Sequence, residues 1–197
     1  GSAIHLSSDG SVVAIGAEYN DGNGFSSGHV RIYQNINGNW TQVGSDIDGE
    51  AARDSSGWAV TLSSDGSVVA IGAQYNDGNG LSSGHVRIYQ NVGGSWTQVG
   101  SDIDGEAVGD RSGYSVSLSS DGSVVAIGAP YNDGSGTSSG HVRIYQNIGG
   151  SWTQVGSDID GEATGDTSGY SVSLSSDGSV VAIGAPYNDG SGTSSGH

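Results

Sequence analysis

The feature that most constrains this chain is an internal repeat of fixed length. The string LSSDGSVVAIGA occurs four times, and each occurrence follows the previous one by 56 residues without an insertion. It begins at Leu6, Leu62, Leu118 and Leu174. A fixed period of this kind is typical of proteins that stack equal structural units, each covering the apolar surface of its neighbour. The chain divides into three repeats, at residues 1–56, 57–112 and 113–168, and a half repeat at residues 169–197.

Glycine and cysteine usage narrows the fold class. Gly accounts for 37 of the 197 residues, and it recurs at fixed places between clusters of β-branched residues, as expected for turns between strands. Cys is absent, which excludes disulfides and thiolate metal sites. No segment shows the periodicity of an amphipathic helix. We therefore expect an all-β fold.

The second repeat illustrates the four strands that we predict in each repeat. They cover residues 58–62, 68–73, 85–90 and 96–101. The first and third strands alternate apolar and polar residues, whereas the second is apolar throughout, as expected for a sheet that is covered on both faces. Ser64-Asp65-Gly66 predicts a tight hairpin between the first two strands, and Gly93-Gly94 predicts another between the last two.

Four short antiparallel strands in every 56 residues match the size of one blade of a β-propeller. Each blade has two apolar faces and cannot bury them alone, but stacking around an axis covers both. We therefore predict an all-β β-propeller of four-stranded antiparallel blades, with about three and a half blades in this chain. Residues 1–197 would form a single propeller domain or part of one.

Three segments of the third repeat carry a resemblance to a known family. They are GDRSGYSV from Gly109, VVAIGAP from Val124 and GHVRIY from Gly140. This pattern resembles the FG-GAP repeat, which has a Phe-Gly opening, a Gly-Ala-Pro after the second strand and a Gly-x-Val-x-Val-Tyr third strand. Gly-Ala-Pro is intact in the last two copies, and Ser replaces the Phe of Phe-Gly. The resemblance covers the whole chain and implies a seven-bladed, integrin-α-like propeller.

The charge of the chain excludes several classes of partner. It carries 21 acidic residues and 5 Arg without any Lys, for a net charge of −16. Nucleic acids and anionic membrane surfaces repel such a polyanion, so we expect neither as a partner. No apolar run approaches the ~20 residues needed to cross a bilayer, so we expect no membrane insertion.

Alternating carboxylates follow the fourth strand of every repeat. They are Asp46, Asp48, Glu50 and Asp54, then Asp102, Asp104, Glu106 and Asp110, then Asp158, Asp160, Glu162 and Asp166. Carboxylates around a Gly turn suit a hard cation, so these residues are candidate calcium ligands. The alternative is that they cap turns and solvate a loop. The FG-GAP family's own calcium loop lies between the first two strands, where this chain has only Ser-Ser-Asp-Gly, so its ligands have no counterparts here.

Two further polar patterns recur in each repeat. His85 and Arg87 represent a pair at the start of the third strand. We expect the His to hydrogen-bond structurally, with metal ligation as the alternative, and the Arg to pair with an Asp of a neighbouring blade. The string Asn76-Asp77-Gly78 predicts a turn, with a contribution of ligands as the alternative.

One Trp opens the fourth strand of each full repeat. These residues are Trp40, Trp96 and Trp152. Trp in this position favours packing between blades, and the alternative is stacking on a sugar ring of a bound glycan. We keep them as candidate ligand-binding residues.

The repetition of every polar group argues against catalysis, because a single active site normally breaks the symmetry of a repeat array. We expect a non-catalytic binding or adhesion module, extracellular or at the cell surface, that presents repeated loops to a protein or glycan. The alternatives are a structural subunit of a surface or filament assembly, and a propeller glycan hydrolase or lyase. Because an open ring exposes apolar faces, we also expect self-association, or a remainder of the propeller that completes the ring.

Overall fold

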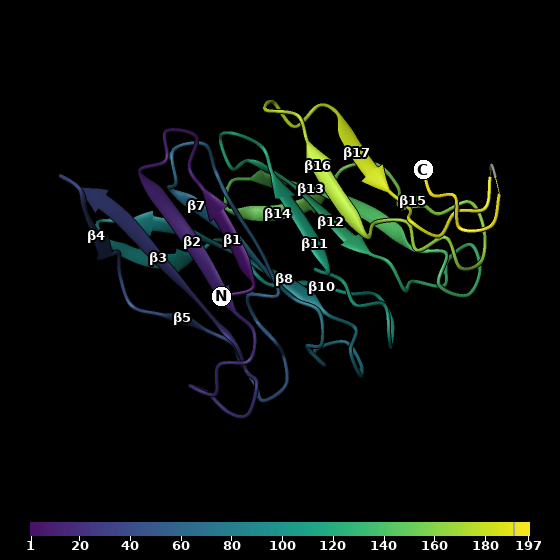
Figure 1. Ribbon diagram of the computed structural model, residues 1–197, viewed down its shortest axis with the longest axis horizontal. Helices are drawn as coiled ribbons and strands as arrows, with labels where there is room; N and C mark the ends of the chain where they lie inside the picture. Colours follow the sequence, from purple (N-terminus) through teal and green to yellow (C-terminus); the bar gives the residue numbers. More distant parts are fainter. Residues whose placement is uncertain (191) are drawn as a thin grey trace.

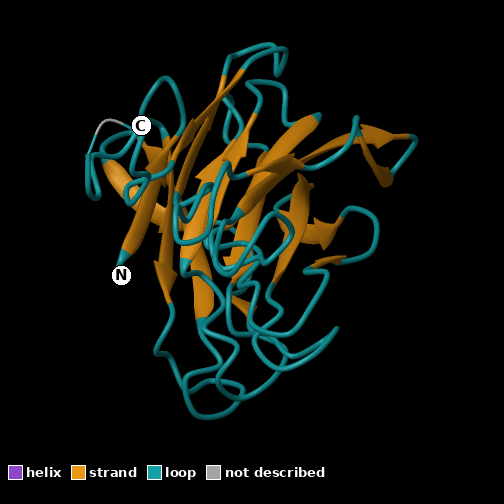
Figure 2. Cartoon of the chain, turned by 90° about the vertical axis from the view of Figure 1, so that its right-hand side faces the viewer, coloured by secondary structure: helices purple, strands orange, loops and turns teal. Residues whose placement is uncertain are grey.

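The computed structural model describes residues 1–190 and 192–197, and every regular element among them is a β-strand. Consequently no helix in that part of the chain could cross a membrane. Each repeat forms one antiparallel sheet, and successive sheets lie side by side as the blades of a partial β-propeller (Figure 1). The predicted fold class is therefore confirmed. Figure 2 shows that the long loops gather at one end of the sheets.

The bounds of the strands repeat from blade to blade. The first blade contains β1 (Ala3–Leu6), β2 (Val12–Ala17), β3 (His29–Ile36), β4 (Asn39–Gln42) and β5 (Ile47–Asp48). The second contains β6 (Ala59–Leu62), β7 (Val68–Ala73), β8 (His85–Val92), β9 (Ser95–Gln98) and β10 (Ile103–Asp104). The third contains β11 (Ser115–Leu118), β12 (Val124–Ala129), β13 (His141–Ile148), β14 (Ser151–Gln154) and β15 (Ile159–Asp160). The half repeat contains β16 (Ser171–Leu174) and β17 (Val181–Gly184).

The outer strand of each blade is divided into two pieces. In the second blade β9 pairs with the last half of β8, and β10 pairs with its first two residues in the register His85↔Asp104. A single outer strand over residues 96–101 was predicted, and that prediction is wrong at its C-terminal end. Gly100 has a φ of +73°, which an extended strand cannot accommodate, so the strand ends and resumes at Ile103. Part of the predicted acidic loop is therefore strand.

The inner hairpin of each blade is held by its own turn residues. In the second blade Asp65 Oδ1 accepts hydrogen bonds from the Ser67 amide at 2.9 Å and the Ser63 hydroxyl at 2.7 Å. Ser63 Oγ in turn accepts the Val68 amide at 2.9 Å. These bonds, the Ser67 amide first, lower the pKa of Asp65. The Ser-Ser-Asp-Gly string thus supplies the hydrogen bonds that close the hairpin within its own blade.

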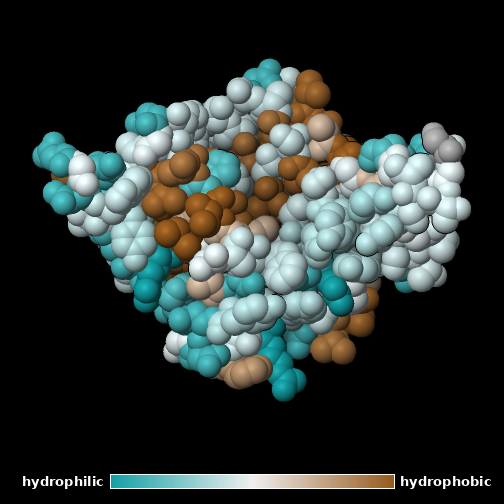
Figure 3. Space-filling view, viewed as in Figure 1, coloured by the Kyte–Doolittle hydropathy of each residue, from teal (hydrophilic) through white to brown (hydrophobic). Residues whose placement is uncertain are grey.

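Packing between blades supplies the core. One cluster joins Val30 and Ile32 of the first blade to Val69 and Ile71 of the second, and a second cluster repeats the arrangement between the second and third blades. All six residues of β7 are buried because this strand has a neighbouring blade on each side. The first blade lacks one neighbour, and apolar side chains gather in the region of β1 and β2 at its surface (Figure 3).

Glycines allow the backbones of neighbouring blades to approach closely. A Cβ on Gly72 would overlap the carbonyl oxygen of Gly113 on the next blade. The hairpin turns are also joined, because the Ser8 amide donates to Ser64 O and the Ser64 amide donates to Ser120 O, both at 2.8 Å. The blades are therefore connected by backbone hydrogen bonds as well as by apolar packing.

A row of aromatic side chains lies just before the inner strands of successive blades. Trp58 and Tyr114 have ring centroids 5.6 Å apart, and Tyr114 and Tyr170 have centroids 4.8 Å apart. Arg111 lies over the rings of Tyr75 and Tyr131 at 5.0 and 4.4 Å. Such contacts add to the packing between successive blades.

Trp96 gives a direct test of the contact between blades. Its indole nitrogen donates to Val43 O of the preceding blade at 2.9 Å, whereas Trp40 has no preceding blade and is exposed. We expect Trp96→Phe to lower the free energy of unfolding by about 1–2 kcal/mol, because it leaves that carbonyl without its donor. Trp40→Phe is the matched control and should change stability little. Chemical denaturation of both variants checks this, and equal losses would contradict it.

Candidate functional site

The structure distributes the predicted acidic residues over different environments. Asp110 lies buried in the link that follows the second blade, where its Oδ2 accepts the Ala107 amide at 2.9 Å. The same oxygen accepts the side-chain amide of Asn132, on the next blade, at 3.0 Å. Asp54 and Asp166 make equivalent contacts in their own repeats. These three carboxylates therefore join consecutive blades.

The Asn-Asp-Gly strings form turns, as their composition predicted. Asn132 Oδ1 accepts the Gly134 amide at 2.8 Å, and Asp133 Oδ1 accepts the Ser138 amide at 2.7 Å. Their role is to shape the long loops at one end of each blade (Figure 2).

The other acidic residues converge with histidine at the junctions between blades. Glu50 of the first blade and Asp102 of the second both face His85, whose Nδ1 lies 3.9 Å from Glu50 Oε2 and 3.8 Å from Asp102 Oδ2. At the next junction Glu106 and Asp158 face His141 with both distances at 3.8 Å. In each junction the ligand-type atoms lie within 4.8 Å of one another.

Arg87 completes the junction between the first two blades. Its Nη1 lies 3.5 Å from Glu50 Oε1, and its Nη2 donates to the carbonyl oxygen of Asp48 at 2.7 Å. Pairing with an Asp carboxylate of a neighbouring blade was predicted. The neighbouring blade instead supplies a Glu carboxylate and an Asp backbone carbonyl.

The first blade shows what happens when no preceding blade is present. Arg31 turns to its own blade and binds Asp46 with two nitrogens, Nε at 3.0 Å and Nη2 at 2.8 Å. His29 Nδ1 then lies 3.5 Å from Asp46 Oδ2 and 3.9 Å from Asp48 Oδ1. The complete junction group thus requires two adjacent blades.

Burial dominates the electrostatics of the complete junction. It lowers the pKa of His85 to about 4, with the charge of Arg87 acting in the same direction, so the imidazole is neutral at pH 7. Burial also raises the pKa of Glu50 and of Asp104. In the first blade the Arg31 guanidinium lowers the pKa of Asp46 instead. A neutral imidazole keeps a free lone pair for a cation.

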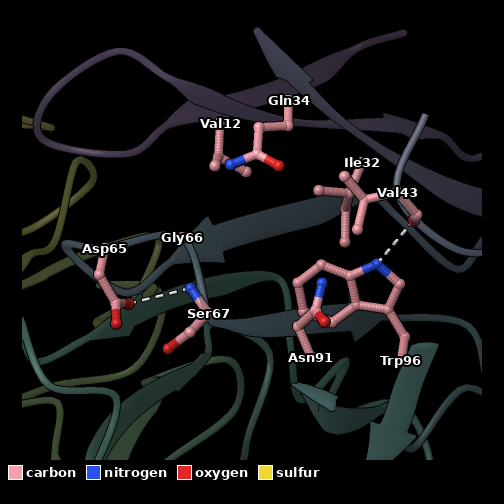
Figure 4. A pocket seen from close by; sticks show the side chains of 9 residues that line it. All are labelled: Val12, Ile32, Gln34, Val43, Asp65, Gly66, Ser67, Asn91 and Trp96. Carbon is pink, nitrogen blue, oxygen red and sulfur yellow. Dashed lines mark hydrogen bonds between the residues drawn. The ribbon is translucent and has the colours of Figure 1, made fainter. Parts of the chain in front are cut away.

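Two of the three predicted tryptophans, Trp96 and Trp152, line cavities between blades, whereas Trp40 is exposed. Figure 4 shows Trp96 facing Val12 and Ile32 of the first blade, with its indole nitrogen bonded to Val43 O. This cavity has a volume of about 310 Å³. Trp152 repeats the bond, to Val99 O at 2.9 Å. Packing between blades, the favoured interpretation of these residues, is therefore confirmed for Trp96 and Trp152.

Sequence reasoning missed the histidines as members of the acidic groups. His85 has no carboxylate at ligand spacing within its own strand. Asp102 comes from the residue just before β10, and Glu50 comes from the preceding blade. The repetition of the sequence did contain a signal that these residues belong together. His, Asp and Glu recur together once in every 56 residues, which is expected if each junction needs one of each.

A second surface is formed by the long loops. A cavity of about 500 Å³ lies between the loops of the first two blades, lined among others by Tyr19, Phe25, Tyr75 and Leu81. Phe25 and Leu81 are largely exposed at the loop tips. This end of the molecule therefore presents apolar side chains beside polar and charged ones, including Arg53 and Asp77.

One known family model matches part of the chain. Residues 101–145 match the family model of the FG-GAP repeat. This match covers less than a quarter of the chain, within the second and third repeats. The matched segment runs from the outer strand of one blade into the third strand of the next, and most of its residues recur at the 56-residue period. The resemblance deduced from Gly-Ala-Pro and the third strand is therefore confirmed.

Solved structures support the same architecture for these FG-GAP-like blades. A candidate 6-phosphogluconolactonase from Bacteroides uniformis aligns over 92% of this chain with a TM-score of 0.59 and 13% identity. A second such protein, from Bacteroides fragilis, aligns over 91% with a TM-score of 0.57 and 14% identity. Hydrazine synthase from Kuenenia stuttgartiensis aligns over 91% with a TM-score of 0.55 and 14% identity.

These similarities bear on the fold alone, because the identities are so low. The aligned region covers 46%, 40% and 54% of those three chains, so the present chain spans about half the length of the structures it resembles. A search of curated proteins found no match to the chain.

Proposed function

We propose that this chain is a non-catalytic binding module, extracellular or at the cell surface, that recognises a protein or glycan through its long loops. The observation that carries the proposal is where the repeats differ. Strands 12–17 and 29–35 have identical sequences in all three full repeats, whereas the loop segments 23–25 and 52–55 change from one repeat to the next. A constant framework with variable loops is typical of a recognition surface.

The two variable segments form one surface. The Arg53 amide donates to Phe25 O at 2.8 Å, and the Gly109 amide donates to Leu81 O at 2.9 Å in the next repeat. At the tip, Phe25 is replaced by Leu81 and then by Thr137. The loop tip therefore carries a different side chain in each repeat, next to the cavity between neighbouring loops.

The arrangement of polar groups favours binding over catalysis. The His-Asp-Glu group occurs in the same form at two junctions, which a single reaction centre would not require. The enzymes among the structural relatives share too little sequence to transfer an activity. The proposed role thus rests on the loop surface rather than on any unique site.

The binding role is tested by removing the apolar loop tips. A variant with Phe25→Ser, Leu81→Ser and Val108→Ser should bind its ligand about tenfold more weakly or worse, because exposed apolar anchors carry much of the energy of an interface. The control replaces residues that are also at least half exposed, at the other end of the blades: Ile36→Ser, Val92→Ser and Ile148→Ser. Binding is measured on a glycan array and on a panel of extracellular matrix proteins.

Three results would contradict the proposal. They are the absence of any saturable ligand on either platform, an equal loss in the control variant, and turnover of a polysaccharide by the unmodified chain. The last result would instead support a hydrolase or lyase.

A second role, as a subunit of an assembly, is favoured by the uncovered face of the first blade. Ile4 and Leu6 are 63% and 52% exposed, whereas their counterparts Val60 and Leu62 on the second blade are 9% and 3% exposed. The difference is that the preceding blade covers Val60 and Leu62. We propose that a second copy of this chain covers the free face, because a blade of the same kind already fits it inside the chain.

Solution mass tests this association. Light scattering should show a mass above that of the 19.6 kDa monomer that falls on dilution, and Leu6→Ser should shift the equilibrium toward the monomer. Leu81→Ser, at a comparably exposed Leu of the loop surface, should leave it unchanged. A monomer at every concentration would rule the assembly out.

A further inference from the structure

Two buried histidines in this structure lack hydrogen bonds. The side chains of His85 and His141 are only 2% and 1% exposed, no described residue makes a hydrogen bond to either imidazole, and His141 Nε2 is fully buried without a partner. Their nearest polar neighbours are carboxylate oxygens at 3.8–3.9 Å, beyond hydrogen-bonding range. Buried polar groups normally have partners, so these two imidazoles call for an explanation.

The carboxylates around each imidazole are already oriented. Asp102 Oδ1 accepts a hydrogen bond from Gln98 Nε2 at 2.6 Å, which leaves Oδ2 facing His85. Glu50 Oε1 faces Arg87, which leaves Glu50 Oε2 facing His85 Nδ1. Gln154 holds Asp158 in the same way at 2.6 Å. A second oxygen held by a neighbouring side chain is the usual arrangement around a metal-binding carboxylate.

The spacing of the three ligand-type atoms suits an ion at their centre. A tetrahedral zinc ion about 2.0–2.2 Å from nitrogen and oxygen ligands holds those ligands roughly 3.4 Å apart. The imidazole nitrogen lies 3.8 and 3.9 Å from the two carboxylate oxygens, and all three atoms lie within 4.8 Å of one another, so the carboxylates would have to move inward to hold the ion. Both carboxylates can move and can be reached from solvent, because the Glu50 side chain is 45% exposed and that of Asp102 is 29% exposed.

We propose that each complete blade junction binds a divalent transition-metal cation of the zinc type. The ligands are Glu50, His85 and Asp102 at one junction, and Glu106, His141 and Asp158 at the next. An imidazole nitrogen with two carboxylates suits zinc, whereas calcium takes six to eight oxygens. Because the Glu belongs to one blade and the His and Asp to the next, the ion links neighbouring blades.

The first blade serves as an internal comparison. His29 lies near Asp46 and Asp48, but no preceding blade supplies a Glu, and Arg31 holds Asp46 Oδ2 at 2.8 Å. The guanidinium therefore already holds the carboxylate oxygen that faces the imidazole. We therefore expect this incomplete group to bind zinc far more weakly than the two complete ones.

Zinc titration of the chelator-treated chain tests the proposal. Calorimetry with ZnCl₂ should show two tight sites per chain, one for each complete group. Glu50→Gln should leave one site, and Glu50→Gln with Glu106→Gln should leave none, while His5→Gln, at a His outside the groups, should keep both. Gln98→Ala should weaken one site about 10- to 100-fold, because it releases Asp102. Cobalt should give a visible absorption band that the double Glu variant lacks.

The Glu variants are chosen because their side chains are partly exposed, so the fold should survive, and circular dichroism checks this. Zinc should also raise the melting temperature of the unmodified chain but not that of the double variant. The proposal is overturned if zinc uptake is not saturable, if the double Glu variant takes up two ions as before, or if calcium binds at these groups in preference to zinc.

Discussion

The packing of one blade against the next is the interaction on which the rest of this structure depends. A single blade is only a small sheet with two apolar faces, and it buries them only between neighbours. The consequence is visible in identical sequences, because β7 is buried at every residue while β2 keeps half of its residues partly exposed on the side without a neighbour. Glycines such as Gly72 permit this packing by letting adjacent backbones approach closely.

The same constraint divides the blade into constant and variable parts. The second strand and most of the third strand keep the same sequence from repeat to repeat, whereas the innermost strand and the loop segments at one end change. The acidic residues follow this division. Asp110 and its equivalents tie each blade to the next, and Glu50 and Glu106 reach across to the histidine of the following blade. Recognition by the loops and metal binding at the junctions would thus use separate parts of each blade.

Much of the fold was predictable because the repeat is regular and its turns are marked. The second strand at residues 68–73 and the Ser64-Asp65-Gly66 hairpin are where the pattern places them. The split of the outer strand was not predictable, because it depends on the positive φ that Gly100 adopts. The junction groups were missed for a related reason. Their members come from two blades, and spacing along one strand carries no information about which side chains meet across an interface.

Hydrogen exchange tests the dependence of each blade on its neighbours most directly. The peptides VVAIGAEY, residues 12–19, and VVAIGAQY, residues 68–75, share the same strand sequence and strand pairing but differ in their neighbours. At a concentration where the chain is monomeric, mass spectrometry should show slower exchange for residues 68–73, which lie between two blades, than for residues 12–17. Equal protection, or greater protection in the first blade, would contradict the account.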